Sequence, residues 1–61
     1  MKFYEATSSF YNDGRANAVL TNVVEADEQP QNVVKSLKRC DVYIDYFKNK
    51  KAAEEFIKQT A

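Results

Sequence analysis

The tripeptide Asn12-Asp13-Gly14 lies between two stretches of about ten residues each, and both stretches have the composition of β-strands. Gly14 is the one glycine of the chain, and it supplies the left-handed backbone that a tight hairpin loop needs. These features predict a β-hairpin over residues 2–26.

Two registers of this hairpin compete. A two-residue turn would pair Tyr11 with Ala16, whereas a three-residue loop with Gly14 in a bulge would pair Tyr11 with Arg15. A slip of one residue moves a whole strand to the other face of the sheet. The three-residue loop gathers one mostly apolar face, made of Tyr4, Ala6, Ser8, Phe10, Ala16, Ala18 and Leu20. The opposite face then collects the polar residues Glu5, Thr7, Ser9, Arg15, Asn17 and Thr21. Because this separation is the better one, the pattern favours the three-residue loop.

Residues 27–39 are harder to interpret. The polar segment 27–32 contains Pro30 and predicts a loop. In the segment 33–39, the spacing of Val33, Val34 and Leu37 fits a helical stripe with Pro30 near its first turn. The same segment also fits an extended edge strand, which is the interpretation that we favour.

The C-terminal part predicts a strand and a helix. Apolar and polar residues alternate over residues 41–47, as in a half-buried strand. Asn49 can cap a helix that runs to about Gln59. Glu54 and Lys58 have the spacing of a favourable ion pair. The expected apolar stripe of this helix consists of Ala52, Ala53, Phe56 and Ile57.

The expected fold class is therefore α+β, in a single domain over residues 1–61. It has a small antiparallel sheet with one C-terminal helix packed on one face. The sheet consists of the hairpin and a third strand, and an extra edge strand is an open alternative. A chain of 61 residues buries about 60% of its unfolded surface, so its stability margin is thin. With no His and one Cys, neither a structural metal nor an internal disulfide is expected, and self-association as a homodimer is the remaining source of stability.

The residue types argue against an enzyme. Without His there is no ordinary general base near neutral pH and no Ser-His or Cys-His pair. Cys40 lies beside the cations Lys38 and Arg39, but a semi-buried thiol is a simpler interpretation than a reactive one. Asp41 and Asp45 would stand about 13 Å apart on a strand, too far to share one bond or ion. No catalytic residue, metal ligand or cofactor is predicted.

The charge balance and the hydropathy of the chain limit its expected cellular location and its expected partners. Nine Lys and Arg balance nine Asp and Glu, which argues against a dedicated duplex-DNA binder. No apolar run is long enough for a signal peptide or a membrane span, so no membrane partner is expected. Together with the lone thiol, this predicts a reducing cytoplasm as the location.

One short helix covers one face of the sheet, so apolar residues on the other face are candidates for partner binding. These residues are Phe3, Tyr11, Val19, Val23, Tyr43 and Phe47. The sequence thus predicts a small protein-interaction module that forms a homodimer and binds an unidentified protein.

A lysine cluster at the start of the predicted helix supports an alternative. Lys48, Lys50 and Lys51 oppose the helix dipole and could hold an anion, a nucleotide or nucleic acid. An exposed cluster, partly offset by Glu54 and Glu55, is the favoured interpretation, since charge runs are usually solvated. The aromatic residues lack the Lys/Arg-Gly-aromatic pattern of RNA-recognition sheets, so nucleic acid is the less favoured partner.

Several segments, considered together, resemble a known group. They are the segments 4–8, 12–15, 39–47 and 53–56, which read YEATS, NDGR, RCDVYIDYF and AEEF. They are similar to short proteins of mainly Firmicute bacteria and of their phages or mobile elements, a group with no established activity. The resemblance implies a context, because small phage-borne domains often bind and block a host protein, and it transfers no site residue. The chain departs from the group at Lys50-Lys51, where more acidic residues are expected.

Overall fold

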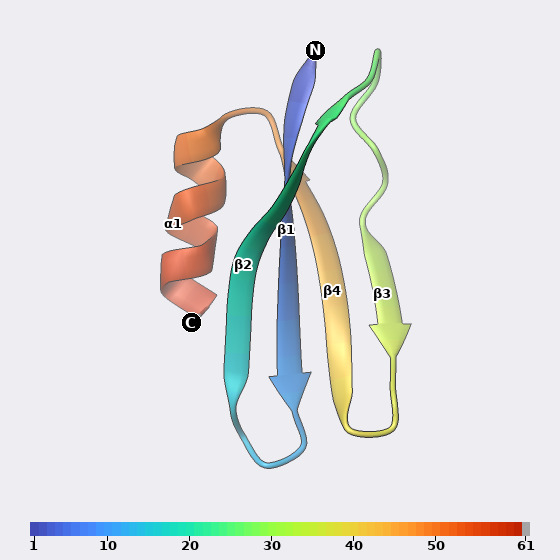
Figure 1. Ribbon diagram of the computed structural model, residues 1–61, viewed down its shortest axis with the longest axis vertical. Coiled ribbons are helices and arrows are strands. Elements are labelled where there is room, and N and C mark those ends of the chain that lie inside the picture. Colours follow the sequence, from blue (N-terminus) through green and yellow to red (C-terminus); the bar gives the residue numbers. More distant parts are fainter. Residues whose placement is uncertain (61) are drawn as a thin grey trace.

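The computed structural model describes residues 1–60 as four strands followed by one helix (Figure 1). The elements are β1 (Lys2–Tyr11), β2 (Ala16–Glu25), β3 (Val33–Ser36), β4 (Cys40–Phe47) and α1 (Lys50–Thr60). The α+β fold class, with an antiparallel sheet and one C-terminal helix, is thus confirmed. The helix of the described residues is too short and too polar to cross a membrane.

The four strands form one antiparallel sheet in the order β2-β1-β4-β3. The connection of residues 26–32 therefore leads from one edge of the sheet to the other. Its Gln29 side-chain amide donates a hydrogen bond of 2.8 Å to the carbonyl oxygen of Tyr46 in β4. Figure 1 shows the end of β2 and this connection at the end of the sheet opposite the two hairpin turns.

The β1–β2 hairpin has the three-residue loop that the side-chain pattern favours. The Tyr11 amide donates to the Arg15 carbonyl at 2.8 Å, and the Gly14 amide donates to the Tyr11 carbonyl at 3.0 Å. Gly14 has a φ of 94°, a left-handed conformation that a Cβ would strain. The prediction of Tyr11 opposite Arg15 is confirmed.

A β-bulge interrupts β2 further from this loop. Ala6 lies opposite Leu20, but Glu5 lies opposite Asn22, so Thr21 is the extra residue. Beyond the bulge the alternation of β2 is shifted, and Val23 pairs with Tyr4. Between the loop and the bulge, the even-numbered residues of β2 therefore share a face with the even-numbered residues of β1. Beyond the bulge, the odd-numbered residues of β2 lie on that face.

The segment after Pro30 is extended, as favoured, because Val33–Ser36 pairs with β4 as strand β3. The Leu37 amide donates to the Cys40 carbonyl at 2.9 Å and closes the β3–β4 turn. Val33 lies opposite Ile44, and Val34 lies opposite Tyr43. The two valines of β3 thus lie on different faces of the sheet.

The helix α1 begins as predicted. The Asn49 side-chain oxygen accepts a hydrogen bond of 2.7 Å from the Ala52 amide, which is an N-cap. The rings of Phe56 and Phe47 lie 5.2 Å apart between centroids and join the helix to β4. The predicted Glu54–Lys58 ion pair is wrong, because the Glu54 carboxylate instead lies 3.8 Å from Lys50, one turn earlier.

The sheet has two distinct faces. The helix face carries the even-numbered residues of β1 and, through the β1–β4 register, Phe47 and its odd-numbered neighbours in β4. The open face carries the odd-numbered residues of β1 and the even-numbered residues of β4. A helix of 11 residues is about 16 Å long and a strand of ten residues about 33 Å, so α1 spans roughly half the strand length.

The core is correspondingly thin. Among residues 1–60 the buried ones are Phe3, Ala6, Ser8, Ala18 and Ala53, and Phe3 is the one large apolar side chain in this set. On the helix face, Phe10 and Tyr43 pack edge to face at 5.5 Å between centroids, and both remain partly exposed. Most of the large apolar side chains of this chain therefore retain contact with solvent.

Candidate interaction surface

An apolar row crosses the open face from one edge of the sheet to the other. The strand registers align Val19 of β2, Thr7 of β1, Ile44 of β4 and Val33 of β3. Val19 is 45% exposed and Val33 is 37% exposed, while Ile44 is half-buried. Because α1 packs on the opposite face, this row has no helical layer over it.

The row next to it adds a second apolar side chain on β4. Here Ser9 of β1 lies between Asn17 of β2 and Val42 of β4, and Lys35 of β3 follows at the edge. On β4 and β3 the apolar residues of the open face are Val42, Ile44 and Val33. The part on β1 and β2 is mostly polar, with Val19 and Tyr11 as its exposed apolar members.

A hydrogen-bonded cluster occupies the polar part of the open face. The Thr21 hydroxyl donates to a Glu5 carboxylate oxygen at 2.6 Å, and the Tyr46 hydroxyl donates to the other oxygen at 3.0 Å. The hydroxyls of Thr7 and Thr21 lie 3.0 Å apart. The hydrogen bond to Glu5, together with burial and the charge of Glu5, raises the pKa of Tyr46 above its ordinary value. The cluster thus holds one carboxylate in place with partners from three strands.

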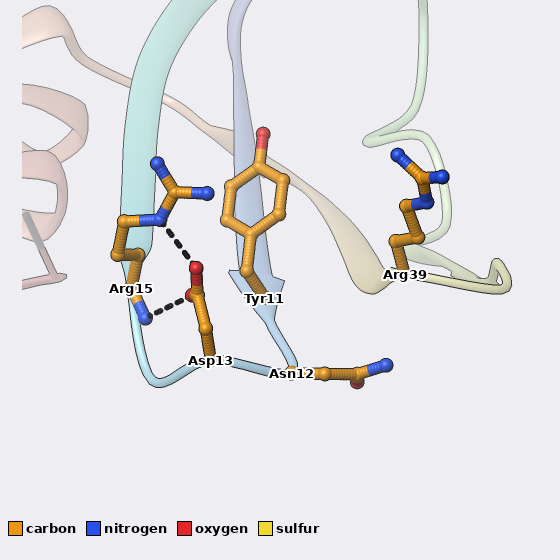
Figure 2. Close-up of a pocket in the computed structure, with 5 residues that line it drawn as sticks. All are labelled: Tyr11, Asn12, Asp13, Arg15 and Arg39. Carbon is orange, nitrogen blue, oxygen red and sulfur yellow. Dashed lines mark hydrogen bonds and ion pairs between the residues drawn. The ribbon is translucent and has the colours of Figure 1, made fainter.

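A basic hollow of about 340 Å³ lies at the hairpin end of the open face (Figure 2). Tyr11, Asn12, Asp13, Arg15 and Arg39 line it. The Arg15 Nε donates to the Asp13 carboxylate at 2.8 Å, and the Arg15 guanidinium carbon lies 5.4 Å from the centroid of the Tyr11 ring. Figure 2 shows Arg15 and Arg39 on either side of Tyr11.

The hollow is built by two turns that are held together. The Asn12 amide donates to the Arg39 carbonyl at 3.1 Å, and the Asn12 side chain donates to the Lys38 carbonyl at 3.2 Å. Within residues 1–60 the Arg39 guanidinium makes no ion pair, whereas Arg15 is paired with Asp13. The basic hollow therefore keeps an excess positive charge, although the whole chain is formally neutral.

The expectation that the six predicted partner-binding residues share one face of the sheet is wrong. Tyr11 and Val19 lie on the open face and are exposed. Phe3 also belongs to this face by register, but it is 1% exposed and forms part of the core. At that end of the sheet β1 stays paired with β2 as far as Lys2 and Glu25.

The other three residues lie on the helix face. Tyr43 and Phe47 pair with even-numbered residues of β1, and Phe47 packs on Phe56 of α1. Val23 is moved to this face by the bulge at Thr21. The physical reason is that strand pairing, rather than the parity of a residue number, decides which face a side chain occupies.

The predicted lysine cluster is exposed at the start of α1. Lys50 is paired with Glu54 at 3.8 Å, and the Asn49 cap occupies the Ala52 amide. An anion at this helix end would therefore compete with a carboxylate and a cap. Among residues 1–60, no three His, Cys, Asp or Glu side chains gather as a metal site.

Sequence reasoning missed Val33, Val42 and Ile44 of the apolar surface. Of the five residues that line the basic hollow it assigned only Tyr11 to a binding site, and so it missed Asn12, Asp13, Arg15 and Arg39. The alternation in β4 placed Val42 and Ile44 together, but it could not say that their side of the sheet is the uncovered one. Arg39 carried no signal, because the hollow forms when two turns distant in sequence meet.

The comparisons with known proteins give no family and no relative for this chain, so the functional argument rests on the surface described above. No protein-family model matches the chain, and the searches of curated proteins and of solved structures found no significant match.

Proposed function

We propose that this protein is a protein-interaction module that forms a homodimer through its open face. The observation that carries the proposal is the row of Val19, Ile44 and Val33, which crosses all four strands without a layer above it. Uncovered apolar surface of this kind usually marks an interface. Two open faces packed together would form a sheet-on-sheet core of the kind found in β-sandwiches.

The exposed area supports the presence of a partner. The chain has an accessible surface of 4633 Å², whereas a monomer of 7.0 kDa is expected to expose about 4,000 Å². The excess of about 600 Å² approaches the roughly 800 Å² that each partner buries in a standard interface. A second copy of the chain is a fitting partner, because it carries the same apolar row on its own open face.

A pair of adjacent valines provides a matched test. Val33 lies on the open face and Val34 on the helix face of the same short edge strand. Both are exposed, so a lysine at either position can reach water without unfolding the chain. We expect Val33→Lys to shift the protein toward monomer in sedimentation equilibrium, and Val34→Lys to leave association close to that of the wild type.

The result can contradict the proposal in two ways. If the wild type is monomeric up to millimolar concentration, the homodimer is wrong. If Val34→Lys dissociates the dimer while Val33→Lys does not, the interface lies on the helix face, around Phe10 and Tyr43.

A further inference from the structure

The basic hollow holds guanidinium donors that the rest of the chain leaves free. Asp13 engages Arg15 through its Nε atom at 2.8 Å and its backbone amide at 3.1 Å, so the two terminal nitrogens of Arg15 make no hydrogen bond within residues 1–60. The Arg39 guanidinium makes neither a hydrogen bond nor an ion pair in that range. A guanidinium is a planar fork of N–H donors that matches a phosphate group. Donors from both hairpin turns are thus available to an anion in the hollow.

The charges around the hollow leave it positive. The charged residues of the two turns and of the strand ends beside them are Asp13, Arg15, Lys35, Lys38, Arg39 and Asp41. The ion pair neutralises Asp13, and Asp41 lies on the helix face, where it accepts from a serine hydroxyl at 3.0 Å. Lys35, Lys38 and Arg39 have no ion pair within the described residues, and Lys35 lies on the open face. An anion at this end of the sheet therefore meets unpaired cations, while the carboxylates there are already engaged.

Tyr11 adds an aromatic ring to the hollow. It is 38% exposed, and the guanidinium carbon of Arg15 lies 5.4 Å from the centroid of its ring. Because Asp13 holds this arginine, the stack is in place before a ligand arrives, which lowers the cost of ordering on binding. Figure 2 shows Arg39 on the side of Tyr11 away from Arg15. An exposed ring with cations on either side suits a nucleotide, because bases stack on aromatic rings and guanidinium groups bind the phosphate.

The size and the place of the hollow fit a small ligand. Its volume of about 340 Å³ lies near the lower end of the range for small-molecule sites, which is about 300–1,000 Å³. Tyr11 is four residues from Thr7 of the apolar row, which is about 13 Å along β1. The hollow is therefore a site apart from the apolar row of the proposed homodimer.

We infer that the basic hollow is a nucleotide-binding site, in which the phosphate lies against the Arg39 guanidinium and the base stacks on Tyr11. This function lies beyond the proposed dimer and does not depend on it. A carboxylate ligand would use the same guanidinium donors but would leave the exposed ring of Tyr11 without a partner. A free nucleotide and a nucleotide of a single strand share this chemistry, whereas a duplex keeps its bases inside the stack.

Nuclear magnetic resonance titration of the isotope-labelled full chain tests the site. The probes are thymidine monophosphate, thymidine and a short single strand of thymidylate. We expect the monophosphate to shift the amide signals of residues 11–15 and 38–40 in a saturable manner, and thymidine to bind about tenfold more weakly. A single strand that binds more tightly than the monophosphate, with an affinity that falls more steeply with salt, identifies single-stranded nucleic acid as the ligand. Equal affinities identify a free nucleotide.

Three variants assign the contacts. Arg39→Gln should weaken binding of the monophosphate about tenfold and leave that of thymidine unchanged. Tyr11→Leu should weaken binding of both about tenfold, because it removes the stacking surface. Both side chains are exposed, so these variants should keep the fold. Lys58→Gln makes the same change of charge on α1 as Arg39→Gln makes in the hollow, and it should leave binding unchanged.

Several results would overturn the nucleotide site. One is the absence of saturable shifts at the hollow up to millimolar concentration of the monophosphate. Shifts confined to residues 48–52 would place the nucleotide at the lysine cluster instead. Equal weakening by Arg39→Gln and Lys58→Gln would show an effect of net charge alone. A glutamate-rich peptide that binds the hollow more tightly than the monophosphate would make it a site for an acidic protein.

Discussion

At the scale of single residues, Glu5 is the best-defined polar group of the open face. One carboxylate oxygen accepts from Thr21 at 2.6 Å and the other accepts from Tyr46 at 3.0 Å. Hydroxyl donors from two neighbouring strands thus satisfy both oxygens of this half-buried carboxylate. The cluster thereby fixes side chains of β1, β2 and β4 in a single arrangement close to the apolar row.

The effect of this cluster on Tyr46 can be measured. Its pKa is raised chiefly because the neutral hydroxyl donates to Glu5, and burial and the charge of Glu5 add to the effect. A raised folded pKa stabilises the protein fully below the unfolded value of about 10. That contribution is lost as the pH rises through the folded value. We expect the wild type to lose more stability than Tyr46→Phe in alkaline urea denaturation.

A second variant identifies the cause. Glu5→Gln removes the charge and weakens the acceptor, so the pKa of Tyr46 should fall toward its ordinary value. Ultraviolet titration of tyrosinate, with Tyr46→Phe as the control that assigns the step, measures this shift. Identical titration curves for the wild type and Glu5→Gln would show that Glu5 does not perturb Tyr46.

At the scale of elements, the local ones could be predicted and their long-range pairing could not. Gly14 and the alternating residues around it determine the hairpin register, and Asn49 determines the start of α1. Each of these signals depends on residues close in sequence. The candidate surface depends instead on the bulge at Thr21 and on the register between β1 and β4. No short-range pattern marks either feature, so three predicted contact residues were assigned to the wrong face.

The N-cap of α1 gives a prediction at this scale. Asn49→Ala removes the acceptor of the Ala52 amide and should lower the free energy of unfolding by about 1 kcal/mol. Asn49→Asp keeps an acceptor and adds a negative charge at the helix N-terminus, so its stability should match or exceed that of the wild type. Urea denaturation of the three proteins measures both differences. Equal losses in the two variants would mean that the amide group itself, and not capping, stabilises this end.

At the scale of the whole molecule, the fold distributes its apolar residues over too many surfaces for one short helix. In the part of the chain that the structure describes, Phe3 is the one large side chain that is fully buried, and α1 spans about half the length of the strands. A chain of 61 residues with so small a core gains little stability by itself. In the proposed homodimer a second copy on the open face would complete this core, and folding and association would then be linked.

This link predicts that stability depends on protein concentration. If the folded state is a dimer and the unfolded state is a monomer, mass action raises the unfolding midpoint as the concentration increases. With an unfolding enthalpy of about 0.7 kcal/mol per residue, the midpoint should rise on the order of 5 °C for each tenfold increase. Calorimetry over a hundredfold range of concentration measures this slope. Val34→Lys should keep the slope, whereas Val33→Lys should melt lower and independently of concentration. A wild-type midpoint that does not move would show that the thin core is sufficient for the monomer, and that the open face does not contribute to stability through a second copy.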